Sequence, residues 1–105
     1  MPGRAVAQQV FTASTSTGVS ATAYFGTGHY RVSALIENPS TKSFSGRIEV
    51  GMGNSTAWFS VTSIATSTGN VLRTSTGGVV FDKARFLTDT NSTTGGVNVW
   101  LLAAV

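Results

Sequence analysis

The chain has 105 residues, the length of one domain, with 29 Ser or Thr, 12 Gly and no Cys, a composition that excludes disulfide bonds and cysteine-ligated zinc. Only 10% of the residues are charged, and one His and four carboxylates leave few titratable groups to pair for acid–base catalysis, which argues against an enzyme. The net charge of +3 comes from seven scattered basic residues, unlike the clustered Lys and Arg of nucleic-acid sites.

Short alternating or continuous apolar segments are separated by Gly, Ser, Thr and Asn at intervals of about eight to twelve residues. That spacing is typical of an all-β sandwich or barrel, and no segment keeps the apolar period of a helix. We predict an all-β, single-domain antiparallel sandwich, similar to a jelly roll, with about seven or eight short strands. The domain spans residues 1–105, and residues 1–4 are expected to be a flexible arm.

The first three predicted strands cover residues 5–11, 19–25 and 29–37. The sequence Gly-Thr-Gly at 26–28 favours a tight hairpin between the second and the third, because Gly tolerates positive φ. In these two strands alternate residues share the face expected to be buried: Val19, Ala21, Ala23 and Phe25, then Tyr30, Val32, Ala34 and Ile36.

Three further strands are predicted over residues 44–52, 57–65 and 71–74. In the second of them Trp58 and Phe59 lie on opposite faces, so either the strand is covered on both sides or one ring serves an interface. In residues 44–52, Arg47 and Glu49 face out and the inward set is Phe44, Gly46, Ile48, Val50 and Met52.

The last two predicted strands cover residues 79–87 and 97–105, and residues 88–96 between them are the most loop-like stretch of the chain. The final strand is apolar on both faces and carries no charge, which indicates that it is central or covered by a partner. The few charged groups are expected to form ion pairs, in which Arg31 and Arg85 contact one of three carboxylates: Glu37, Glu49 or Asp82.

No residue pattern supports a catalytic, metal or cofactor site. His29, the only candidate base, has no carboxylate near it in the sequence, and no Ser lies in a G-x-S-x-G motif. Residues 89–95 are partly similar to a calcium loop but lack its bidentate Glu, and an Asx turn explains the same residues. We expect no cofactor, no metal and no small-molecule substrate.

The sequence also argues against a membrane partner. No apolar run approaches the roughly 20 residues that cross a bilayer, and residues 1–11 lack the apolar stretch of a signal peptide. We therefore expect synthesis in the cytoplasm and no membrane partner. The scattered basic residues predict no nucleic-acid partner.

Four aromatic residues could form a sugar-stacking platform, although their positions in strand patterns favour core packing: Trp58, Trp100, Tyr24 and Tyr30.

Four passages carry a family resemblance: HYRVSALIE at 29–37, IEVGMGNSTAWF at 48–59, FDKARF at 81–86 and GGVNVWLLAAV at 95–105. Together they resemble small virion proteins of tailed bacteriophages, the β-sandwich decoration or cement proteins of capsids. The resemblance implies a sandwich or jelly-roll fold, a homotrimer that docks on the major capsid protein, and a place on the capsid surface. It implies no catalytic residue.

The leading hypothesis is therefore a non-enzymatic virion protein that binds the major capsid protein and stabilises the head. The expected contact residues lie in the N-terminal segment, in the Trp58 hairpin and in the C-terminal strand: Arg4, Phe11, Trp58 or Phe59, Trp100, Leu101 and Leu102. Two alternatives remain open, a carbohydrate- or receptor-binding module of a phage tail and a minor tail or neck subunit.

Overall fold

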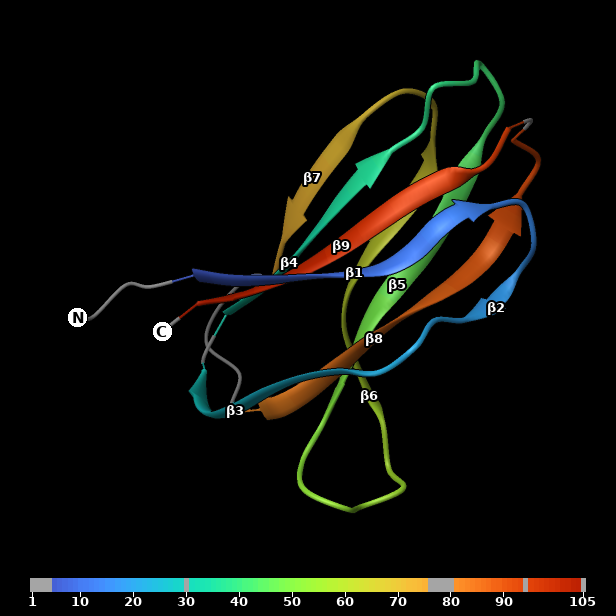
Figure 1. Cartoon of the computed structure of the whole chain (residues 1–105). Coiled ribbons are helices and arrows are strands. Elements are labelled where there is room, and N and C mark those ends of the chain that lie inside the picture. The colour runs from blue at the N-terminus through green and yellow to red at the C-terminus, as the bar shows by residue number, and fades with distance from the viewer. Residues whose placement is uncertain (1–4, 30, 76–80, 94, 105) are drawn as a thin grey trace.

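A computed structural model describes residues 5–29, 31–75, 81–93 and 95–104 (Figure 1). The described residues form nine strands and no helix, in two layers that face each other. The strands are β1 (Ala5–Ser14), β2 (Gly18–Val19), β3 (Ala23–His29), β4 (Arg31–Glu37), β5 (Phe44–Gly51), β6 (Phe59–Ser67), β7 (Val71–Thr74), β8 (Phe81–Asn91) and β9 (Val97–Ala104).

Sheet A has the strand order β1-β9-β4-β7, and sheet B has the order β2-β8-β5-β6, with β3 beside β2 on the same edge of β8. All of these pairs are antiparallel. If β2 and β3 are counted as one interrupted strand, this is the eight-stranded, two-sheet arrangement of a jelly roll. The predicted fold class, an antiparallel jelly-roll-like sandwich, is confirmed.

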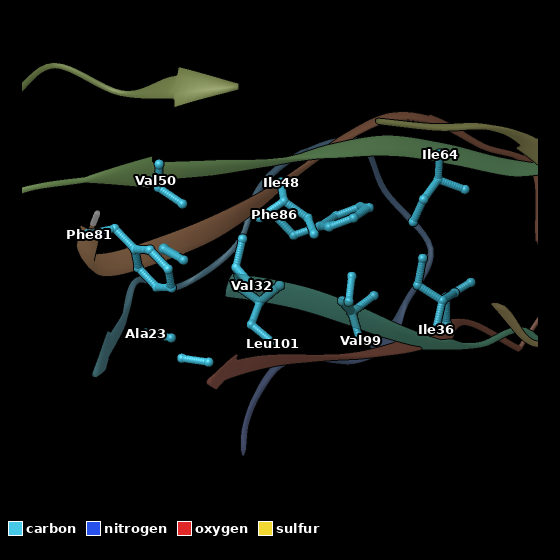
Figure 2. Packing of buried hydrophobic residues seen from close by; sticks show 14 of the residues in the cluster. Ala23, Val32, Ile36, Ile48, Val50, Ile64, Phe81, Phe86, Val99 and Leu101 are labelled. Carbon is cyan, nitrogen blue, oxygen red and sulfur yellow. The ribbon is translucent and has the colours of Figure 1, made fainter. Parts of the chain in front are cut away.

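The core lies between the two sheets and is built from alternate residues of the long strands (Figure 2). The inward sets predicted for β4 and β5 are confirmed except for Met52, which is 46% exposed, and Tyr30, which lies outside the described residues. Met52 follows the end of β5, where the chain has left the sandwich. At the centre the Phe44 and Phe86 rings stack with their centroids 5.7 Å apart.

The prediction of one continuous strand over residues 19–25 is wrong. β2 and β3 are separate, and Val19 is 51% exposed although it was expected to face the core. Between them Ser20 is buried, where its N–H donates to the Phe86 carbonyl oxygen at 2.8 Å and its hydroxyl accepts the Phe86 N–H at 2.9 Å. The hydroxyl thus takes a position in the ladder, and this breaks the alternation that the side chains suggest.

The tight hairpin predicted at residues 26–28 is also wrong. These residues belong to β3, which pairs with β8 in sheet B, whereas β4 pairs with β7 and β9 in sheet A. The chain therefore passes from one sheet to the other between β3 and β4. Both strands carry an apolar inner face, and placing them in opposite sheets buries both faces in one core.

Residues 88–96 were predicted to be a loop, but β8 continues to Asn91. In this extension Thr90 pairs with Ser45 and Asn91 pairs with Phe44 of β5. The ladder is made by backbone groups, so a polar stretch can extend a strand when a partner strand runs beside it. The turn between β8 and β9 is correspondingly shorter, and Gly95 and Gly96 adopt positive φ there.

Candidate interaction surfaces

The described residues enclose no pocket and contain no group of three or more His, Cys, Asp or Glu side chains placed to hold a metal ion. In the same part of the chain no helix is long and apolar enough to cross a membrane. The side chain of His29, the only candidate base, lies outside the described part. Exposed apolar and charged side chains lie on the outer surfaces of the two sheets and in the loops at their ends.

The outer face of sheet A is apolar at its centre. Leu35 of β4 pairs with Leu72 of β7 on one side and with Trp100 of β9 on the other, which places three large apolar side chains in a row across the sheet. Leu35 is 36% exposed, Leu72 is 63% exposed and Trp100 is half-buried. No charged residue stands in this row.

The next row on the same face is smaller. Ser33 of β4 pairs with Thr74 and with Leu102, and the hydroxyls of Ser33 and Thr74 are 2.8 Å apart in a hydrogen bond. Charged residues stand at the two ends of β4, namely Arg31 and Glu37, and both are exposed. We call the central residues of this surface the apolar face: Ala7, Leu35, Leu72, Trp100 and Leu102.

The outer face of sheet B is charged instead. Glu49 of β5 is 8% exposed and lies between two arginines. Its Oε1 accepts a hydrogen bond from Arg85 Nε at 2.8 Å, and its Oε2 is 3.7 Å from Arg47 Nε. Arg47 Nη1 is in turn 3.9 Å from Asp89 Oδ1. The ion pair predicted for Arg85 is confirmed with Glu49, whereas Arg31 makes no ion pair within the described ranges.

The loop between β5 and β6 extends beyond the sandwich at one end (Figure 1) and is held by consecutive residues of β8. Both carboxylate oxygens of Asp82 accept the Gly53 N–H, at 2.9 and 3.0 Å, and Lys83 Nζ donates to the Ser55 carbonyl oxygen at 2.9 Å. At the end of the loop Trp58 lies under two cations. Its ring centroid is 4.2 Å from the Arg85 guanidinium carbon and 4.9 Å from Lys83 Nζ.

Replacing Glu49 with Gln is expected to lower the free energy of unfolding by about 1–3 kcal/mol, because two arginines then face each other without the anion between them. Asp89→Asn is the matched control. Asp89 is half exposed and 3.9 Å from Arg47, so its loss should cost less than about 0.5 kcal/mol. Urea denaturation followed by tryptophan fluorescence measures both variants, and equal losses would contradict the central role of Glu49.

The structure separates the predicted contact residues into different environments. Phe59 is 65% exposed on the edge strand β6, and Trp100 and Leu102 lie half-buried on the apolar face. Phe11 packs partly against the core. Arg4 lies outside the described residues.

The expectation that Leu101 contacts a partner is corrected by its position in the structure. Leu101 is fully buried between the sheets, so its side chain is not available to a partner. Trp58 is half-buried beneath its two cations rather than free. Leu35 and Leu72 were not predicted to be contact residues. The signal for Leu35 was present, because it stands at an outward position of an alternating strand.

No protein-family model matches the chain, and no curated protein matches it by sequence. Among solved structures it is similar in fold to an SPBc2 prophage-derived protein, YomS, with a TM-score of 0.63 and 19% identity, over 98% of this chain and 95% of that chain. It also matches carbohydrate-binding modules of family 29. One match has a TM-score of 0.46 and 16% identity, over 95% of this chain and 88% of that chain. A mutant of the CBM29-2 module has a TM-score of 0.48 and 14% identity, over 95% and 91%. At these identities the likeness to YomS describes a shared fold.

Proposed function

We propose that the protein is a non-enzymatic structural subunit of a phage particle, which decorates the head by binding the major capsid protein and further copies of itself. On this proposal it is made in the host cytoplasm and works on the capsid surface of the virion. The observation that carries the proposal is the apolar face, which a single chain leaves in solvent. The fold shared with a prophage-derived protein is consistent with this class of function.

The two outer faces support a role in assembly, because the face of sheet B is charged and the face of sheet A is apolar at its centre. On sheet B the cations are already matched by Glu49 and Asp89 within the chain. On sheet A the exposed centre is leucine and tryptophan, and such patches ordinarily mark a surface that another protein covers. We assign this face to contacts between copies. The resemblance implied a trimer, a prediction that stays untested, and the sedimentation mass distinguishes a trimer from a pair.

The β5–β6 loop is the part of the molecule that we assign to the major capsid protein. It presents Met52, 46% exposed, and ends at Phe59, 65% exposed. The bonds from Asp82 and Lys83 hold the loop in place before it meets a partner, which reduces the entropy lost on binding. Many copies on one shell act together, so each contact can be small.

The test is co-sedimentation of the purified protein with heads of the phage that encodes it. Wild-type protein is expected to saturate the heads, and Phe59→Ser should weaken attachment about tenfold or more, because an exposed anchor is lost. Val19→Ser is the matched control, since Val19 is an exposed apolar residue of β2, away from the loop. Wild-type protein that ignores the heads would contradict the proposal.

A carbohydrate- or receptor-binding role is the second candidate, and one observation favours it. Tyr24, 68% exposed, is paired with Lys83 and so lies on the same face of sheet B as Trp58, Glu49 and Arg47. Against it, the Trp58 ring already has Lys83 and Arg85 over it, which competes with stacking on a sugar. A chain that binds glycans and not heads would favour this candidate over the first.

A further inference from the structure

We propose that two copies of the chain pair through their apolar faces. The two copies of sheet A then face each other, and a two-fold axis lies between them, perpendicular to β4 and at the level of Ala34. The two β4 strands then run antiparallel, one above the other. This inference rests on the proposed function, because it names the partner, the symmetry and the register of the self-contact assigned there. The partner is a second copy of this chain.

The charges at the two ends of β4 support this symmetry. Arg31 and Glu37 are both exposed on the outer face, and each is three residues from Ala34. Under the two-fold axis, Arg31 of one copy opposes Glu37 of the other, and the contact occurs twice. A parallel arrangement would instead oppose like charges at both ends, which is unfavourable. The face is therefore complementary in charge to an antiparallel copy of itself.

The side chains of the two copies are also complementary in size in this arrangement, because larger ones meet smaller ones. The row of Leu35, Leu72 and Trp100 lies one residue to one side of Ala34, and the row of Ser33, Thr74 and Leu102 lies one residue to the other side. The axis exchanges the two rows. Leu35 then meets Ser33 of the other copy, Leu72 meets Thr74 and Trp100 meets Leu102. A row of large side chains packed on a row of smaller ones fills space better than a row packed on itself.

The area available is that of a weak dimer. Four strands about 4.8 Å apart, with about 3.4 Å per residue along β4, make a face of roughly 450 Å² per copy before side-chain relief is counted. Two copies together bury roughly 900 Å², which is below the roughly 1,200 Å² at the lower end of standard interfaces and in the range of weak contacts. Two sheets stacked in this way cross at about 30°, which keeps the central strands in contact and separates the outer ones.

The first experiment measures mass by sedimentation velocity over a series of micromolar concentrations. Wild-type protein is expected to approach twice the 10.9 kDa mass of the chain. Leu35→Glu places like charges beside the axis and should weaken association by about a hundredfold or more. Val19→Glu adds the same charge on the outer face of sheet B and should leave association unchanged. Circular dichroism checks that each variant is folded.

The second experiment tests the register. Arg31→Glu and Glu37→Arg, each alone, place like charges opposite one another and should each weaken association about tenfold or more. An equimolar mixture of the two variants should associate again, because each Glu then faces an Arg. The double variant Arg31→Glu/Glu37→Arg should also return to the wild-type constant, since both opposed pairs are restored in reverse.

Each other outcome overturns the inference. A chain that stays monomeric, a trimer, a dimer that tolerates Leu35→Glu, or single charge variants without effect would each exclude this two-fold contact. These results are distinguishable from a failure of the proposed function. If the dimer forms as described but ignores phage heads, the self-contact stands and the capsid role fails. If the chain binds heads but does not pair, the capsid role stands and the two-fold contact fails.

Discussion

Replacing Gly46 with Ala is expected to lower the free energy of unfolding by about 3 kcal/mol or more, a large part of the stability of a domain of this size. Gly46 lies on β5 and faces the core, where an added Cβ would overlap the Phe86 ring and the Leu87 carbonyl oxygen. The ring cannot move away, because Phe86 is fully buried and stacks on Phe44. The backbone carbonyl belongs to the β8 ladder and cannot move either.

Gly53→Ala separates steric overlap from backbone strain. Gly53 has φ +54° and no atom within 4 Å of an added Cβ, so the substitution costs only the strain of a left-handed residue, about 1 kcal/mol. Urea denaturation followed by tryptophan fluorescence gives both values. If the two substitutions cost the same, the close packing of β5 on Phe86 is not a feature of the folded protein.

The fold class could be predicted because it depends on a local property of the sequence. A strand with one face in a core alternates with a period of two, and β4 and β5 show this period in Val32, Ala34, Ile36, Ile48 and Val50, all of them buried. Turn residues at regular spacing then limit the strand lengths. Neither signal depends on which strands are neighbours, so both could be interpreted without the structure.

The strand pairing could not be predicted in the same way, because it is decided between distant residues. Ser20 is buried only because Phe86 offers its backbone groups 66 positions later in the chain. The Gly-rich residues 26–28 suit a hairpin locally, but β8 and β9 offer β3 and β4 partners in opposite sheets. The polar end of β8 is likewise extended by its partner β5.

The candidate surfaces were predicted only in part. Trp100 and Leu102 were selected because the C-terminal strand is apolar on both faces, and Phe59 because it and Trp58 lie on opposite faces of one strand. Leu72 was not, since a strand of four residues is too short to show alternation. The environment of Trp58 was not predictable either. It depends on a loop folding back so that Lys83 and Arg85 lie over the ring.

Leu101→Ala is expected to lower the free energy of unfolding by about 2–5 kcal/mol, the usual cost of a cavity left by a buried leucine. β9 is apolar at both of its faces, so the sequence does not reveal which residues face the core. The structure places Val97, Val99, Leu101 and Ala103 on the inner face, where each is fully buried. Leu101 therefore contributes to the fold of the single chain and not to contact with a partner.

Leu102→Ala is the matched substitution one residue away, and in the single chain it should cost less than about 1 kcal/mol, because Leu102 is half-buried on the outer face. Denaturation at a protein concentration too low for pairing compares the two variants without any contribution from an interface. A shift of β9 by one residue would exchange its two faces and reverse the order of the two losses. The observed order therefore tests the register of the strand on which the apolar face, the pairing of two copies and the corrected role of Leu101 all depend.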